Sequence, residues 1–328
     1  MKKFWKKTSL FLVTAAMTVS APLMAWALEH DIVILHTNDI HCGINDNIGF
    51  AGLAQIKKDA LARTPNVALV DAGDAIQGAP IGKLSRGLAV VDIMNYLGYD
   101  FCIPGNHEFD YGMDRFLELV PLQRAGYYCA NFVYAGNSKQ VLPGYKIMQY
   151  EDTKVAFVGA STPESLTTST PTFFQNEKGK YIYSFCEDKT GNKLYKQLQK
   201  NVDKARKDGA DYVFIVGHLG MDGTTPQWSS ESVAKNTQGV DAVIDGHSHE
   251  RFTRMVKNKV GKDVLLAQTG TKLKTVGELV ITPNGKLKSQ LITESNDKDA
   301  NIARVIAQEI KTLSLIHISE PTRQEAIS

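Results

Sequence analysis

The segment Gly105-Asn106-His107-Glu108-Phe109-Asp110 carries the densest chemistry in this 328-residue chain. Four of its six side chains can bind a metal ion or transfer a proton. An apolar stretch at 101–104 precedes it and is typical of a short buried strand. A polar turn that directly follows a strand lies at the strand's carboxyl end, where the sites of α/β sheets gather.

The same arrangement occurs four more times, with an apolar run followed directly by Asp, Asn or His. The four further clusters are Asn38-Asp39-Ile40-His41, Asp71-Ala72-Gly73-Asp74, Gly217-His218 and Asp245-Gly246-His247-Ser248-His249. Core packing does not require polar side chains at five strand ends. We therefore interpret the clusters as loops that converge on one site.

The hydrophobic pattern predicts a layered α/β architecture. The continuous apolar runs at 32–35 and 67–70 are typical of strands that are buried on both faces. Further strands are expected at 101–104, 127–130, 155–158, 212–216, 242–244, 264–267, 276–282 and 287–293, and helices at 50–64, 88–97, 113–124, 193–208 and 301–313. We expect 264–267 and 276–282 to pair at a sheet edge, and Pro283-Asn284-Gly285 to form a hairpin turn. The stretch 162–179, rich in Thr, Ser and Pro, reads as a loop.

The first 27 residues predict a Sec export signal. Four lysines precede an apolar region at 10–19, and Ala25-Trp26-Ala27 matches a cleavage site with small residues. The alternative is an uncleaved membrane anchor, but the apolar region is shorter than the roughly 20 residues that a spanning helix needs. We therefore expect a periplasmic, extracellular or cell-surface protein that has no membrane segment after signal cleavage.

The charge balance does not indicate a nucleic-acid partner. The net charge is +2, and removing the four lysines of the signal leaves −2. The hydrophobic content of 43% is ordinary for a globular protein. Of the four cysteines, Cys102 and Cys129 lie in apolar runs and are interpreted as buried small side chains. Cys42 follows His41 and is either a thiolate ligand or a packed residue, the latter being favoured.

The clusters together supply a mixed set of carboxylate, imidazole and amide donors. The candidates are Asp39, His41, Asp74, Asn106, His107, His218, His247 and His249. Such donors suit Mn²⁺, Zn²⁺ or Fe²⁺. Eight are too many for one tetrahedral zinc ion, but they fit two ions that share a bridging carboxylate. Two adjacent cations favour hydrolysis of a phosphoester, because they acidify water and neutralise phosphate charge.

In their order along the chain, these clusters resemble the motifs of the calcineurin-like metallophosphoesterase superfamily. The longer forms Leu35-His-Thr-Asn-Asp-Ile-His41, Asp71-Ala-Gly-Asp-Ala-Ile-Gln-Gly78 and 105–110 resemble the bacterial 5′-nucleotidase family. That family includes UDP-sugar hydrolases and 2′,3′-cyclic-nucleotide phosphodiesterases. The resemblance implies a four-layer αββα sandwich of two mixed sheets, in a catalytic domain that spans 28–295.

The resemblance also implies a role for each site residue. Asp39, His41 and His249 would hold one ion, whereas Asn106, His218 and His247 would hold the other. Asp74 would bridge the two ions. His107 would face the substrate phosphate together with Asn106, and Asp110 would orient it. The three-residue spacing of His107 and Asp110 agrees, because residues three apart share one face of a helical turn.

Two departures from the family pattern are visible. Several family members carry Gln or Asn at the position of His249; because His is also a good ligand, we expect metal binding to be retained, with a changed metal preference. The family also has a C-terminal nucleotide-binding domain. We interpret 296–313 as the linker helix to such a domain, which we expect to be missing here. Residues 314–328 resemble translated sequencing-adapter read-through and are interpreted as a non-native tail.

The sequence thus predicts an exported hydrolase of nucleotide phosphomonoesters, with a metal-bound hydroxide as nucleophile and a small nucleotide as substrate. A 2′,3′-cyclic-nucleotide 2′-phosphodiesterase or a UDP-sugar hydrolase is an alternative, because the catalytic motifs are shared. A non-catalytic surface protein that binds metal or nucleotide is an alternative of another class. The presence of both His107 and Asp110 argues against it, since binding alone does not require that pair.

Overall fold

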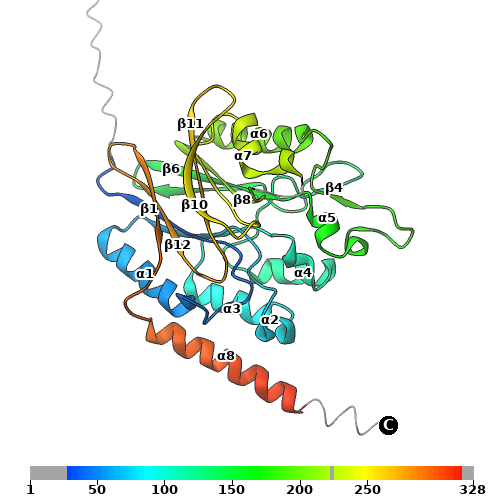
Figure 1. Ribbon diagram of the computed structural model, residues 1–328, viewed down its shortest axis with the longest axis vertical. Coiled ribbons are helices and arrows are strands. Elements are labelled where there is room, and N and C mark those ends of the chain that lie inside the picture. The colour runs from blue at the N-terminus through cyan, green and yellow to red at the C-terminus, as the bar shows by residue number, and fades with distance from the viewer. Residues whose placement is uncertain (1–27, 222–224, 320–328) are drawn as a thin grey trace, which may run out of the picture.

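In the computed structural model of the protein, the described residues are 28–221 and 225–319 (Figure 1). The expected export signal at 1–27 and the last part of the expected tail, 320–328, lie outside them. Within the described part of the chain, no helix is both long and apolar enough to cross a membrane.

The first of two large sheets contains the strand that leads to Asp39. Its strands lie in the order β13 (Leu287–Ile292), β12 (Val276–Ile281), β1 (Ile32–Thr37), β2 (Val67–Asp71) and β3 (Phe101–Cys102). The sheet is mixed, because β1 is parallel to β2 but antiparallel to β12.

The second sheet carries the other half of the polar clusters. Its order is β10 (Arg251–Lys257), β11 (Asp263–Thr269), β9 (Ala242–Ile244), β8 (Tyr212–His218), β6 (Thr153–Ser161) and β5 (Tyr145–Tyr150). This sheet is mixed as well, since β6, β8, β9 and β11 run parallel while β5 and β10 are antiparallel to their neighbours. A small separate sheet joins β4 (Val133–Tyr134) and β7 (Tyr183–Ser184).

The two large sheets pack face to face, which explains the continuous apolar runs in the sequence. Along β1, Ile32 and Ile34 point into the core between the sheets, whereas Val33 and Leu35 point into the core under the helices. The core between the sheets also holds Phe101 from the first sheet and Phe157 from the second, with ring centroids 5.6 Å apart. Both faces of such a strand are buried, so both need apolar side chains.

Helices cover the outer face of each sheet (Figure 1). The first sheet is covered by α1 (Gly49–Arg63), α2 (Pro80–Ser85), α3 (Leu88–Leu97) and α4 (Met113–Leu119), and α8 (Ala300–Ser319) packs on the outer side of α1, α2 and α3. The second is covered by α6 (Asn192–Lys207) and α7 (Ser230–Asn236). The predicted four-layer αββα sandwich is therefore confirmed.

Several sequence-based element predictions were wrong. The segment 127–130 forms no strand and makes only an isolated bridge from Tyr127 to Cys102. The strands β11 and β12 do not pair with each other, because β11 lies between β9 and β10 in the second sheet and β12 lies between β1 and β13 in the first. The hairpin turn at 283–285 is confirmed, since it joins β12 to β13.

Helix ends also differed from the prediction. Helix α4 ends at Leu119 instead of continuing to 124, and a 3₁₀ turn that contains Pro121 follows it, because proline cannot donate a helical hydrogen bond. Helix α8 does not end at 313 but continues to Ser319. The expected loop at 162–179 contains the short helix α5 (Ser165–Thr168). The domain boundary at 295 stays a prediction.

One buried histidine predicts how the stability of the fold depends on pH. His36 on β1 is fully buried against Gly277 of β12, and its two ring nitrogens make no hydrogen bond with the described residues. A Cβ atom at position 277 would lie 1.9 Å from Nε2 of His36, which explains the glycine there. Burial lowers the pKa of His36 to about 3 from an ordinary value of 6.5.

Between these two pKa values the unfolded chain binds a proton at this position and the folded chain does not. The free energy of unfolding should therefore fall as pH drops below 6.5, by up to about 1.4 kcal/mol per pH unit from this group. His36→Leu should remove that part of the slope, measured by urea unfolding from pH 7.5 to 4.5. Parallel pH curves for the two proteins would show that His36 does not titrate in this way.

Candidate metal centre

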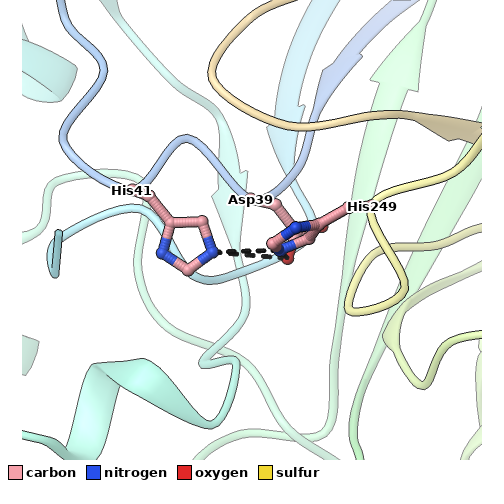
Figure 2. A group of neighbouring side chains, drawn as sticks. All are labelled: Asp39, His41 and His249. Carbon is pink, nitrogen blue, oxygen red and sulfur yellow. Dashed lines mark hydrogen bonds and ion pairs between the residues drawn. The ribbon is translucent and has the colours of Figure 1, made fainter.

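Three of the predicted ligands form the first donor group. Asp39 and His41 come from the loop after β1, and His249 comes from the loop after β9; their ligand atoms all lie within 4.8 Å of one another (Figure 2). Nε2 of His249 lies 3.2 Å from Oδ1 of Asp39 and 3.1 Å from Nε2 of His41. Oδ1 of Asp39 is buried and yet accepts no hydrogen bond from a described residue. A buried carboxylate oxygen that has no hydrogen bond and is flanked by two imidazole nitrogens leaves a place for a cation.

The second donor group lies directly beside the first. It contains Asp74 from the loop after β2, His218 at the end of β8 and His247. Nε2 of His218 lies 3.0 Å from Oδ2 of Asp74 and 3.2 Å from the amide oxygen of Asn106. The amide oxygen of Asn106 therefore lies beside this group.

Asp74 faces both groups. Its Oδ2 is 3.0 Å from Nε2 of His218 and 3.8 Å from Nε2 of His41, which belongs to the other group. Burial by itself raises the pKa of Asp74, but the imidazoles of His218, His107 and His41 outweigh it and hold that pKa well below its usual range. A buried carboxylate between two sets of imidazoles suits a ligand shared by two cations.

Hydrogen bonds on the far side of two imidazoles fix which nitrogen faces the centre. Nδ1 of His218 lies 2.8 Å from the carbonyl oxygen of Ala72, and Nδ1 of His41 lies 3.2 Å from that of Gln77. Each carbonyl can only accept, so each Nδ1 carries the hydrogen and each Nε2 offers its lone pair to the centre. Metal-binding histidines are usually held in this way.

The donor set fits divalent metal ions. All seven predicted ligands come together, and they combine carboxylate and amide oxygens with imidazole nitrogens, as Mn²⁺, Zn²⁺ and Fe²⁺ accept. The site also favours positive charge. Burial by itself lowers the pKa of His218, but the carboxylates of Asp74 and Asp39 outweigh this effect and raise that pKa to about 10. The role of each ligand and the identity of the metal stay predictions.

The backbone at the ligands is unusual. Positive φ angles occur at Asp39 (51°), His41 (47°), Asp74 (59°), His247 (80°) and His249 (56°). Residues other than glycine adopt this left-handed conformation only rarely, although Asp and His do so more readily than most. Strained residues of this kind cluster at functional sites, where the surrounding structure holds them in place.

Glu108 organises two of the loops. Its buried carboxylate accepts backbone N–H groups from Asp74 at 2.7 Å and Ala75 at 2.8 Å, after β2. It also accepts N–H groups from Ile76 at 3.4 Å and from Gly105, after β3, at 2.6 Å. Burial raises the pKa of Glu108 to about 7. One side chain thus joins the loop of Asp74 to the loop of Asn106.

His107 and Asp110 form the predicted pair at the edge of the centre. His107 begins the 3₁₀ turn His107–Phe109, and Asp110 directly follows that turn. Nδ1 of His107 lies 2.6 Å from Oδ2 of Asp110. This hydrogen bond raises the pKa of His107 to about 9. The ring centroid of His107 lies 5.3 Å from that of His41, and the backbone N–H of His107 donates to Oδ1 of Asp74. The pair is therefore placed to act on a group bound at the centre.

Other polar candidates have structural roles. Asp71 accepts the backbone N–H of Gly73, and Asp245 accepts that of Leu219, so both hold turns. Cys42 is buried in the apolar core under the helices and belongs to neither donor group. Burial raises its pKa to about 12, so it is a packed thiol and not a thiolate ligand.

Sequence reasoning missed two residues near the centre, Glu164 and Ser169. Oε2 of Glu164 lies 3.2 Å from Nε2 of His247, and Oγ of Ser169 donates to Oδ1 of Asp110 at 3.1 Å. Both lie in the segment that was interpreted as a loop. The available signal was the sequence Pro163-Glu164. It follows the apolar strand at 155–158 and the polar residues 161–162 at the end of that strand.

Comparison with known proteins identifies the family. The model of the family described as Calcineurin-like phosphoesterase matches residues 32–251. The chain therefore belongs to this family of metal-dependent phosphoester hydrolases.

Among individual relatives, the chain is 27% identical to snake venom 5′-nucleotidase from Gloydius brevicauda, over 91% of this chain and 55% of that protein. It is 27% identical to the 2′,3′-cyclic-nucleotide 2′-phosphodiesterase/3′-nucleotidase of Haemophilus influenzae, over 73% of this chain and 40% of that protein. The chain thus spans about half the length of these relatives.

The fold is also found in solved structures. The 5′-nucleotidase precursor from Thermus thermophilus aligns with a TM-score of 0.72 and 23% identity, over 87% of this chain and 59% of that one. At this identity the likeness shows the fold, which agrees with the four layers described above.

Glu108 yields a prediction for stability. Glu108→Ala should lower the free energy of unfolding by about 3–5 kcal/mol, because four buried backbone N–H groups lose their acceptor. Urea unfolding would measure this change. Glu118→Ala is a suitable control, since the Glu118 side chain is 63% exposed and should contribute no more than about 0.5 kcal/mol. Equal effects of the two substitutions would contradict the role given to Glu108.

Proposed function

We propose that this chain hydrolyses nucleotide phosphomonoesters, in the manner of a 5′-nucleotidase, at a centre that holds two divalent metal ions. The observation that carries the proposal is the pair of adjacent donor groups that share Asp74, with His107 and Asp110 beside them. The activities for which two relatives are named support a nucleotide substrate.

In this proposal, Asp39, His41 and His249 would hold one ion, Asn106, His218 and His247 would hold the other, and Asp74 would be available to both. When bound, the ions supply Lewis acidity, which neutralises phosphate charge and makes water acidic near neutral pH. Mn²⁺, Zn²⁺ and Fe²⁺ all fit these donors.

The chain's own residues position the phosphate and move a proton. Protonated His107 donates to a non-bridging phosphate oxygen or to the leaving oxygen, and the amide of Asn106 faces the same phosphate. Asp110 accepts the Nδ1–H of His107, which leaves Nε2 for the substrate. Glu108 fixes the position of Asn106 relative to Asp74, because its carboxylate accepts backbone N–H groups from both loops.

Two further points belong to the proposal. The same centre suits 2′,3′-cyclic nucleotides, for which the Haemophilus influenzae relative is named, so a cyclic substrate is the second candidate. We also propose export to the periplasm or cell surface. The sequence pattern at 1–27 supports export, and those residues lie outside the described part of the chain.

Metal dependence can be measured directly. The protein should bind two Mn²⁺ ions per chain, lose p-nitrophenyl phosphatase activity on chelation and regain it when Mn²⁺ is restored. Metal analysis and turnover would be followed together, with AMP and 2′,3′-cyclic AMP as further substrates. Full metal loading without turnover on any of these compounds would contradict the proposed hydrolysis.

His107 can be tested separately from metal binding. His107→Asn should lower kcat by roughly 10²–10⁴-fold, because the proton donor is lost. Metal content should not change, since none of the seven proposed ligands is altered. Inductively coupled plasma analysis and p-nitrophenyl phosphate hydrolysis would provide the two readouts. Turnover equal to that of the wild type would exclude this role for His107.

A further inference from the structure

The segment that follows β6 contacts both parts of the candidate site. Glu164 and Ser169 lie on either side of the four-residue helix α5, and both are buried, with 6% and 8% exposure. Glu164 contacts His247, a proposed metal ligand, while Ser169 contacts Asp110, the partner of His107. The metal centre and the proton donor are thus joined through one short segment.

Local hydrogen bonds make this segment rigid. The hydroxyl of Thr162 accepts the backbone N–H of Glu164, and the hydroxyl groups of Thr167 and Thr168 donate to the backbone carbonyl of Glu164. The backbone N–H of Ser169 donates to the carbonyl of Ser165. The distance between the Glu164 and Ser169 side chains is therefore fixed by the turn between them.

Glu164 makes contacts that suit a support for a metal ligand. Oε2 lies 3.2 Å from Nε2 of His247, while Oε1 accepts the backbone N–H of Thr225, in the loop after β8. A carboxylate can only accept from an imidazole, so Nε2 of His247 carries the hydrogen and Nδ1 keeps its lone pair. The backbone N–H of His247 donates to Oδ2 of Asp39 and fixes the other end of the residue.

Ser169 supports the carboxylate of Asp110. Oδ2 of Asp110 binds Nδ1 of His107, and Oδ1 accepts the Ser169 hydroxyl. Both carboxylate oxygens of Asp110 are therefore engaged, and the carboxylate plane cannot rotate freely. The orientation of the His107 ring depends on that plane.

The geometry points to Glu164 and Ser169 as positioning residues: Glu164 presents Nδ1 of His247 to the second metal ion, and Ser169 orients Asp110 and through it His107. This inference rests on the proposed function and deepens it. It assigns a role to 162–169, a segment outside the motifs from which the site was predicted. The Glu164 contact should affect metal binding and the Ser169 contact should affect the His107–Asp110 pair. A variant at either residue therefore serves as the control for a variant at the other.

The Glu164 contact is tested by metal binding alone. Metal-free protein would be titrated with Mn²⁺ in competition with a chelating indicator. Glu164→Gln should weaken one of the two ions by roughly 10–100-fold and leave the other unchanged, because only His247 loses its support. Ser169→Ala should bind both ions as the wild type does. Unchanged affinity for both ions in Glu164→Gln, or equal loss of both, would overturn the assignment.

The Ser169 contact is tested at the His107–Asp110 pair. Ser169→Ala should shift the low-field NMR resonance of the proton between these two residues and lower kcat on p-nitrophenyl phosphate roughly three- to tenfold, with KM unchanged. Ser169→Thr, which keeps the hydroxyl, should restore both. An unshifted resonance in Ser169→Ala, or an equal loss of kcat in Ser169→Ala and Ser169→Thr, would overturn this role. If the metal-loaded wild type shows no turnover, the proposed function fails, while the Mn²⁺ titration and the resonance still decide this inference.

Discussion

The site depends on the four backbone N–H groups that the Glu108 carboxylate accepts. These groups belong to the loops after β2 and β3, about 30 residues apart in the chain, and they are buried. Buried backbone donors need an acceptor, and no strand pairing supplies one where two parallel strands have ended. Glu108 accepts hydrogen bonds from all four groups and thereby fixes the position of Asp74 relative to Asn106. Gly105 completes the junction, since a Cβ there would lie 2.2 Å from Oδ1 of Asp74.

The charges gathered at this junction explain why the site favours a cation. Asp39 and Asp74 are both buried, and imidazole nitrogens of His41, His218 and His249 lie 3.0 to 3.8 Å from their carboxylate oxygens. Buried carboxylates are costly without positive charge nearby. Oδ1 of Asp39 makes no hydrogen bond with the described residues, and the ring nitrogens of His41 and His249 that face the same space lie only 3.1 Å apart. Divalent ions at this place would balance the buried carboxylates and give Oδ1 of Asp39 a partner.

The fold brings the donors together from two sheets. β1, β2 and β3 of the first sheet and β6, β8 and β9 of the second end at the same edge of the sandwich, where their loops converge. The second sheet supplies His218, His247 and His249 as well as the segment with Glu164 and Ser169. The proposed metal ligands are therefore held by loops from both sheets, which share the core around Phe101 and Phe157.

The sequence by itself determined the layered class, most strands and helices, and the identity of every proposed ligand, because apolar runs and donor residues are local properties of the chain. It also indicated the His107–Asp110 pair, since three-residue spacing fixes proximity on a turn. Only the tertiary structure decided the contacts of Glu108, Glu164 and Ser169, the nitrogen that each histidine presents and the positive φ angles at the ligands. It also decided that β11 and β12 belong to different sheets. These features depend on which distant segments pack together, and no local pattern encodes that choice.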